Sequence, residues 1–281
     1  MHNTTKKIAA INDLTGFGRC ALTVTIPVIS AMGVQCCPVP TALFSNHPAY
    51  PSHFSKDFTT ELPAYFSEWK KLGLTFDGIL SGYLNSPEQI SLTKQFIKDF
   101  STIDTKVIID PVMGDHGKLY SVYTEEMCSA MKELCSFAHI LTPNLTEACI
   151  LADVPFHHGD WTKAELHELM NNLLKYGTKL IVISGIPSGD NITNLIYEDT
   201  KGISFLSHPK TSAERSGTGD VFSAILAADA INGISFADSV DKAGNFIRTA
   251  LIFTETHNIP STDGVYFEPL LTNLTSKEDI I

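Results

Sequence analysis

The sequence predicts an α/β fold in which a mostly parallel central sheet carries helices on both faces. Short apolar runs alternate with amphipathic segments along most of the 281 residues, as in sheets whose parallel strands are joined by helices. The composition, 43% hydrophobic residues and 18% charged, is sufficient for a large core. No linker, repeat or low-complexity tract interrupts this pattern. We therefore expect one domain over residues 1–281.

Six apolar runs are the expected parallel strands. In chain order they are IAAIN (8–12), VQCCPVP (34–40), FDGILSGY (76–83), KVIIDPV (106–112), HILTP (139–143) and KLIVIS (179–184). Apolar runs of this kind are typical of strands that are buried on both faces. Two further patterns, ITNLIYE (192–198) and ISFLS (203–207), follow each other with the turn-like DTKG between them. We expect them to form a hairpin that extends one edge of the sheet.

Helical patterns occupy the intervals between the strands. They lie near residues 18–32, 59–71, 86–100, 124–137, 145–153 and 162–176, and two more at about 219–232 and 236–256 close the chain. In open sheets of this class, ligands bind beyond the carboxyl ends of the strands. The residues that directly follow each strand are therefore the first candidates for a functional site.

The charge balance restricts the kinds of partner. A formal net charge of −11 argues against a general nucleic-acid binder, which would carry a basic face. An anionic small ligand remains compatible with this charge, because helix N-termini and a metal ion supply local positive potential. We expect small-molecule partners and no nucleic acid.

The sequence favours a cytoplasmic protein with reduced thiols. The first residues, MHNTTKKIAAIND, lack the apolar segment of a signal peptide, and no run approaches the ~18 apolar residues of a membrane span. The six cysteines include the adjacent Cys36 and Cys37, and Cys128 and Cys135 lie seven apart in a helical pattern. Because no Cys-x-x-Cys occurs, neither a zinc site nor a redox pair is expected.

The stretch RSGTGDVF (215–222) is the most informative local pattern. Gly217, Thr218 and Gly219 stand directly before Asp220, and a helical apolar pattern follows. An ordinary helix start does not need two glycines, whereas close approach of the backbone to an anion does. Phe222 stands at the third glycine position of a dinucleotide fingerprint, so that interpretation fails.

Three more polar clusters follow expected strands. Asp110 begins DPVMGD, Thr142 begins TPNLTE at a helix start, and Ser184 precedes Gly185. Each has a purely structural alternative. Asp110 before a proline is also a turn former, and Asn144 with Glu147 is also an ordinary capping pair.

Taken together, the clusters indicate phosphoryl transfer. The amides at 217–220 are suited to hold the migrating phosphoryl group, and Asp220 to accept the proton of an attacking hydroxyl. Asp110 and Glu147 are candidates to organise Mg²⁺ through water, because this ion prefers oxygen ligands and keeps several waters.

The motifs GTGD, DPVMGD, TPNLTE, FSNH (44–47) and SGYL (81–84) resemble the ribokinase superfamily, and specifically its vitamin B6 (pyridoxal) kinase branch. The resemblance runs from about residue 8 to about residue 250. It implies a three-layer α/β/α sandwich, commonly a homodimer, that uses ATP to phosphorylate the 5′-hydroxymethyl group of pyridoxal, pyridoxine or pyridoxamine. Mg²⁺ is the implied cofactor, with a monovalent cation such as K⁺ as a possible second one.

The resemblance also assigns roles by position. Asp220 matches the catalytic base and Gly217 to Gly219 match the anion hole. The positions that match contacts to ATP and its cation are Asp110, Thr142, Glu147 and Ser184, with Asn144 in support. Tyr83 resembles the aromatic residue that lines the pyridine pocket, although core packing is its alternative. His47 lies in the FSNH turn, where a structural role is as compatible with the pattern as substrate contact.

Two positions depart from the family pattern. Asp13 stands where members usually have serine, and Pro48 stands where they often have threonine. An ionised carboxylate accepts hydrogen bonds and attracts a cation but does not donate. Because pyridoxamine carries a cationic aminomethyl group, we expect Asp13 to favour pyridoxamine over pyridoxal. In this dry position the carboxylate otherwise needs the ring or a protein donor such as Arg19.

Two rival functions remain at this stage. Hydroxymethylpyrimidine kinases of thiamine synthesis share the fold and the reaction, although FSNH and SGYL weigh against them. A non-catalytic sensor of a B6 vitamer or nucleotide would be favoured if Asp220 or Glu147 were missing, and both are present.

Overall fold

A nine-stranded sheet runs through the computed structural model, which describes residues 3–211 and 214–275. Its strand order is β11-β10-β9-β8-β5-β4-β1-β2-β3. The strands are β1 (Lys7–Thr15), β2 (Gln35–Phe44), β3 (Ser55–Asp57), β4 (Gly78–Ser81), β5 (Lys106–Ile109), β8 (Ile140–Leu141), β9 (Leu180–Ser188), β10 (Asn191–Glu198) and β11 (Gly202–Pro209).

The six strands from β2 through β9 in this order pair in parallel, and the remaining strands pair antiparallel at the two edges. This confirms the predicted fold class. The expected hairpin at one edge is β10–β11, and β9 also turns back directly into β10. The sequence patterns did not predict β3 or the small hairpin formed by β6 (Gly114–Asp115) and β7 (Lys118–Leu119).

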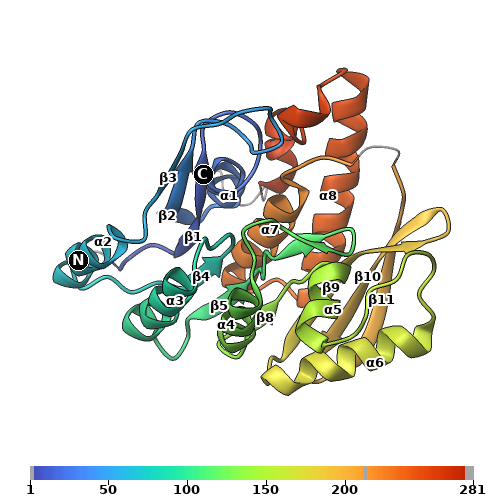
Figure 1. The fold of residues 1–281 in the computed structure, drawn as a ribbon, viewed down its shortest axis with the longest axis horizontal. Helices are drawn as coiled ribbons and strands as arrows, with labels where there is room; N and C mark the ends of the chain where they lie inside the picture. Colours follow the sequence, from blue (N-terminus) through green and yellow to red (C-terminus); the bar gives the residue numbers. More distant parts are fainter. Residues whose placement is uncertain (1–2, 212–213, 276–281) are drawn as a thin grey trace.

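Helices cover both faces of the sheet (Figure 1). One face packs against α2 (Leu62–Lys71), α3 (Pro87–Phe100), α4 (Glu125–Cys135), α5 (Leu145–Ala152) and α6 (Lys163–Leu173). The other packs against α1 (Leu22–Ala31), α7 (Thr218–Asn232) and α8 (Phe236–Thr256). Three short 3₁₀ helices lie at Leu174–Tyr176, Ser261–Asp263 and Glu268–Leu274. The result is the predicted three-layer α/β/α sandwich.

Alternate strand residues point to opposite faces, so the apolar runs supply two cores. In β1, Ile11 packs with the α2–α6 layer and Ile8 with the α1–α7–α8 layer. A cluster of aromatic rings that includes Phe66, Phe96 and Phe100 fills the first core. Helix α7 is buried on all sides over Val221–Asp229, which explains why its sequence is apolar rather than amphipathic.

Several predicted boundaries shift in a way that matters for the site. β1 continues to Thr15, so Asp13 lies inside the strand rather than beyond it. β5 ends at Ile109, directly before Asp110 and its proline, because proline lacks the N–H that would continue the ladder. α1 begins only at Leu22, after a turn in which Ala21 has φ 51°.

None of the helices in the part of the chain that the structure describes is long and apolar enough to cross a membrane. The six cysteines are free thiols, as the sequence predicted.

Candidate active site

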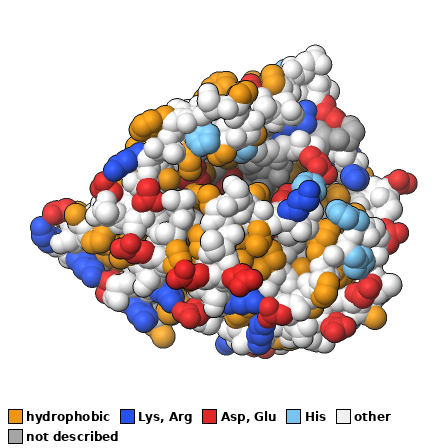
Figure 2. Space-filling model, in the orientation of Figure 1, with side chains coloured by type: hydrophobic (Ala, Val, Ile, Leu, Met, Phe, Trp, Pro, Cys, Tyr) orange, Lys and Arg blue, Asp and Glu red, His pale blue; other side chains and the backbone are white. Residues whose placement is uncertain are grey.

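The predicted site residues meet at the carboxyl edge of the central strands. Backbone hydrogen bonds join this edge from strand to strand: Gly82 N–H donates to Ile11 O (2.8 Å), Asp110 N–H to Ser81 O (2.9 Å) and Thr142 N–H to Ile109 O (3.1 Å). Because parallel strands end on the same side, residues far apart in the chain, such as Ile11 and Gly82, become neighbours there. Figure 2 shows that the surface is hollowed near the middle of this view.

Asn12, inside β1, is the central polar residue of this edge. Its Nδ2 donates to Asp220 Oδ1 (3.1 Å), and its Oδ1 accepts from the N–H groups of Asp13 (3.0 Å) and Tyr83 (2.9 Å). The side chain is 7% exposed. A Cβ at Gly82 would lie 2.5 Å from Asn12 Nδ2, so the glycine makes room for this amide.

Sequence reasoning missed Asn12. It is the last residue of the apolar run IAAIN, and one polar residue there reads as the end of a strand. The available signal was a pair of residues: the amide Asn12 at the end of the apolar run IAAIN, and Gly82 near the end of the run FDGILSGY.

The start of α7 is open to a ligand. Gly217 has φ 86°, and a Cβ there would collide with the carbonyl oxygen of Arg19. None of the side chains that the structure describes caps this helix. A Cβ at Gly219 would meet no atom of residues 3–211 and 214–275 within 4 Å, so this part of the chain leaves space in front of it. The two glycines are therefore required for different reasons. Position 217 adopts the left-handed backbone conformation, whereas the missing side chain at position 219 leaves space for a ligand.

Asp220 faces this space from the first turn of α7. Burial raises its pKa, whereas hydrogen bonds from the Ala21 backbone and from Asn12 lower it by stabilising the charged form. The unusual φ of Ala21 therefore belongs to the turn that holds Asp220. Thr218 Oγ1 donates to Arg215 O (3.2 Å), which leaves that hydroxyl bound to its own loop.

The charge of Asp220 in turn acts on two other carboxyl groups, those of Asp13 and Asp110. Burial, with a further contribution from Asp220, raises the pKa of Asp13 to about 7. Burial and the same neighbour raise the pKa of Asp110 to about 8. Carboxyl groups gathered out of water resist ionisation together, so the site favours a proton or a cation.

The predicted protein donor for Asp13 is corrected by the structure. Thr15 Oγ1 donates to Asp13 Oδ2 (2.7 Å). Arg19 instead pairs with Glu268 (2.7 Å) and lies over the ring of Tyr266. Thr15 is the better donor because it lies two residues along the same strand and therefore points to the same face.

Glu147 combines both roles that its sequence pattern allowed. Asn144 and Glu147 form a complete capping box at the start of α5, and Glu147 Oε1 also accepts from Met113 N–H (3.1 Å). The side chain is 3% exposed. Burial and the charge of Asp110 raise its pKa well above the usual value. Glu147 therefore clamps α5 to the segment after β5 and also contributes to the acidic potential around Asp110.

The remaining predicted residues on this side of the site lie around the Asn144–Glu147 capping box. Asn144 Nδ2 donates to Gly114 O (2.9 Å), and Asn144 pairs with Ser184 in an isolated parallel bridge. Thr142 is buried, with its hydroxyl directed at Ile109 O (3.4 Å). Ser184 lies within β9 rather than after it.

The aromatic side of the site is formed by Tyr83 and Phe44. Their rings meet edge to face with centroids 6.2 Å apart, and the Tyr83 hydroxyl donates to Asn85 Oδ1 (2.7 Å). Burial raises the pKa of Tyr83 to about 12. His47 is held in its turn, because Nδ1 accepts from Ala49 N–H (3.1 Å). The structural role considered for His47 is therefore present.

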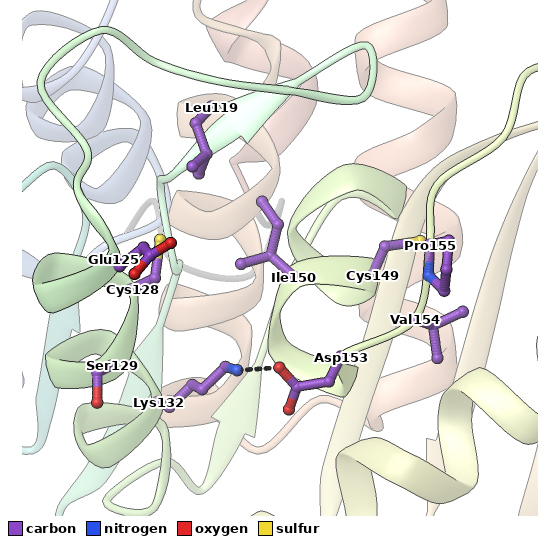
Figure 3. Close-up of a pocket in the computed structure, with 10 residues that line it drawn as sticks. All are labelled: Leu119, Glu125, Cys128, Ser129, Lys132, Cys149, Ile150, Asp153, Val154 and Pro155. Carbon is purple, nitrogen blue, oxygen red and sulfur yellow. Dashed lines mark hydrogen bonds and ion pairs between the residues drawn. The ribbon is translucent and has the colours of Figure 1, made fainter.

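A different groove lies between α4 and α5 (Figure 3). The Lys132 side chain of α4 meets Asp153 at the end of α5, and Leu119 covers the other end. None of the predicted site residues lines this groove.

The sandwich, the glycine start of α7 and the acidic residue behind it define a kinase of the ribokinase superfamily. The phosphomethylpyrimidine kinase family model matches residues 26–265. The chain therefore belongs to the phosphomethylpyrimidine kinase family, whose members phosphorylate a hydroxyl group.

Individual relatives agree with this family. A pyridoxine/pyridoxal/pyridoxamine kinase of Bordetella avium is 29% identical over 258 residues, which cover 88% of this chain and 85% of that protein. A Bacteroides thetaiotaomicron structure, provisionally assigned as a phosphomethylpyrimidine kinase and crystallised with pyridoxal, is 38% identical with a TM-score of 0.92, covering 96% of each chain. Pyridoxal kinase from Lactobacillus plantarum is 26% identical with a TM-score of 0.88, covering 97% of each chain.

The two glycines of α7 give a paired prediction of stability. Gly217→Ala should lower the free energy of unfolding by about 1–3 kcal/mol or more, because a non-glycine residue is strained at positive φ and its Cβ collides with Arg19. Gly219→Ala should leave stability unchanged or slightly higher, since alanine favours a helix. Urea unfolding of both variants measures this. Equal losses at the two positions would contradict it.

Proposed function

We propose that this chain uses ATP to phosphorylate the 5′-hydroxymethyl group of a vitamin B6 vitamer: pyridoxal, pyridoxine or pyridoxamine. The observation that carries the proposal is the position of Asp220, beside the open helix start and held by the Asn12 amide. The B6 kinase relatives support the choice of substrate. The direct test is ATP consumption with each vitamer and with hydroxymethylpyrimidine.

In this proposal, Asp220 is the general base. Its ionised carboxylate takes the proton of the substrate hydroxyl, whose oxygen then attacks the γ-phosphorus of ATP as the bond to ADP breaks. The amides of Gly217, Thr218 and Gly219 lie at a helix N-terminus, where backbone N–H groups and the helix dipole favour an anion. They form the anion hole for the transferred group.

The nucleotide side of the site is formed by residues after β5 and β8, by one residue within β9 and by the start of α7. We assign ATP contacts to Asp110, Thr142, Asn144, Glu147, Ser184 and Gly217. The buried carboxyl groups of Asp110 and Glu147 fit a hydrated Mg²⁺, because the charge of Asp110 raises the pKa of Glu147 and a cation would offset that repulsion. Mg²⁺ would supply charge neutralisation at the phosphates. A monovalent cation such as K⁺ is also compatible with this acidic site.

The vitamer side is formed by Asp13, His47 and Tyr83. The Tyr83 ring is suited to line the pyridine pocket, and His47 supports the turn beside it. The single-domain organisation over 1–281, the homodimer and the cytoplasmic location stay predictions from the sequence.

A second candidate substrate is hydroxymethylpyrimidine, which the name of a Bacillus subtilis relative, hydroxymethylpyrimidine/phosphomethylpyrimidine kinase, favours. Both rings carry a hydroxymethyl group and suit the same base. A turnover preference for the pyrimidine in the assay above would select this alternative. Turnover of either substrate would exclude a purely non-catalytic sensor.

Replacement of the base should remove turnover selectively. Asp220→Asn is expected to lower kcat by about 10²–10⁴-fold, because an amide does not accept the hydroxyl proton. ATP binding, measured by calorimetric titration, should stay close to that of the wild type. A variant with near-wild-type kcat would exclude Asp220 from this role.

Asn12 should set the pH dependence of the reaction. Its N–H stabilises ionised Asp220, so Asn12→Ala should raise the pKa of Asp220 further. The base is active only when ionised, and the acid limb of kcat/KM should therefore move upward by about one to two pH units. Gly82→Ala should shift the limb the same way, since its Cβ would displace the Asn12 amide.

The matched control is Asn85→Ala. Asn85 contacts the Tyr83 hydroxyl, and none of its described hydrogen bonds involves Asp220. Its acid limb should stay at the wild-type pH. A uniform loss of activity in the Asn12 and Gly82 variants, with no displacement of the limb, would contradict the positioning role.

Asp13 should bias the choice of vitamer toward pyridoxamine. No lysine or arginine in the described ranges pairs with its carboxyl group, so a cationic substrate group is a suitable partner. With a pKa of about 7, this preference should grow as the pH rises through neutrality and Asp13 ionises. In Asp13→Ser, the pyridoxamine-to-pyridoxal ratio of kcat/KM should fall about tenfold or more. A change within about twofold, well below that range, would refute the selectivity.

A further inference from the structure

A cavity of about 500 Å³ lies at the amino ends of β5, β8 and β9. It is lined by Lys106, the first residue of β5, by His139, directly before β8, and by Lys179, directly before β9. Because these strands are parallel, this edge is opposite to the one that carries Asp110. None of the residues assigned to the kinase site lines it. The volume is typical of small-molecule sites.

The charged side chains of this lining are basic. Lys106 and Lys179 line the cavity together with His139, and no carboxylate does so. Within residues 3–211 and 214–275, neither ammonium group forms an ion pair. The chain has a net charge of −11, whereas the charged side chains that line this cavity are positive.

His139 adds a hydrogen-bond donor of defined geometry. Its Nδ1 accepts from the backbone N–H of Val107 (3.1 Å), so the hydrogen of the neutral ring lies on Nε2. Burial, together with Lys106 and Lys179, lowers the pKa of His139 and favours this neutral form. The ring therefore presents an N–H rather than an acceptor.

The first turn of α8 contributes a polar group without a partner. Ser239 lines the cavity, is 2% exposed, and its hydroxyl has no hydrogen-bond partner in the structure. Buried hydroxyl groups are normally paired, so this one suits a ligand oxygen. The N-terminal turn of a helix also favours an anion. Asp238, the acidic residue of that turn, is bonded to Ser235 and does not line the cavity.

The rest of the wall is apolar. Phe137, Leu226, Ala230 and Phe236 belong to it, so the cavity combines a basic rim with a surface suited to a ring or an alkyl group. Leu226 and Ala230 lie on α7, the same helix that begins at the open glycine start. Ten residues separate Ala230 from Asp220, a rise of about 15 Å along the helix axis.

We propose that this cavity is a second ligand site, which binds a small molecule with one anionic group and an apolar, ring-sized body. Lys106 and Lys179 hold the anionic group with His139 and Ser239 as donors, and the side chains of α7 and Phe236 contact the body. The site does not depend on the proposed kinase reaction.

The probes are 4-fluorobenzoate and 4-fluorophenyl phosphate, observed by ¹⁹F NMR during titration of the full chain. Binding of either acid identifies the anionic group as a carboxylate or a phosphate ester, and both acids should bind better than neutral 4-fluorobenzamide. Lys106→Ala/Lys179→Ala should weaken binding about tenfold or more, because charged hydrogen bonds are lost. Ala230→Phe should do the same by filling the cavity with both lysines still present.

The control is Lys70→Ala/Lys71→Ala, which removes two positive charges from the exposed end of α2 and should change the affinity less than twofold. Every variant keeps the kinase site intact. A probe that bound at the kinase site instead of the cavity would therefore show the same affinity for all variants. Circular dichroism verifies that each variant is folded. Absence of binding to the wild type, or equal affinity in all folded variants, would overturn the proposal.

Discussion

The hydrogen bonds of the Asn12 side chain connect three parts of the chain that no local pattern places together. One amide in β1 holds the first turn of α7 through Asp220, and it also accepts from the backbone of β1 and of the segment after β4. A buried amide that lost one of these partners would leave unpaired polar groups in a dry place. The arrangement therefore specifies how far α7 sits from the sheet, and with it the position of the acid.

The free-energy cost of forming the site comes from burying carboxyl groups. Asp13, Asp110, Glu147 and Asp220 are all held where burial raises the pKa of their carboxyl groups. Hydrogen bonds from the backbone, from Asn12 and from Thr15 offset part of this cost. What remains is a demand for positive charge, which fits a nucleotide that arrives with its cation. In the proposed reaction, the same balance would allow a chain of net charge −11 to take up a polyphosphate.

Helix α7 connects the candidate active site to the basic cavity. The middle of α7 is buried on every side against the sheet, α1 and α8. Because protein interiors are closely packed, this packing fixes the position of the helix relative to the sheet. Its first turn holds Asp220, and its later turns line the basic cavity at the other edge of the sheet. Asp229, near the end of the helix, is buried and paired with Lys242 (2.7 Å), which anchors α7 to α8.

The sequence by itself determined the layers of the fold and pointed to most of the residues that the structure gathers at the candidate site. Apolar runs such as KVIID and KLIVIS, alternating with amphipathic segments, are enough to predict a parallel sheet with helices on both faces. The glycines before Asp220 are enough to predict an anion site, because an ordinary helix start does not need two glycines. Strand ends were less predictable: β1 continues through Asp13, and β3 and the β6–β7 hairpin are short and polar, so they depend on neighbours already in place.

Tertiary structure alone decided which groups touch. From its local sequence, Asn12 is predicted to be only the end of a strand. The local sequence likewise leaves open whether Asp13 pairs with Arg19 or with another donor. Only the packed fold brings Asp220 to Asn12 across 208 positions of the chain and turns Arg19 toward Glu268. The physical reason is that secondary structure follows from short-range sterics and burial patterns, whereas side-chain partners depend on distances between elements, which exist only once both cores are packed.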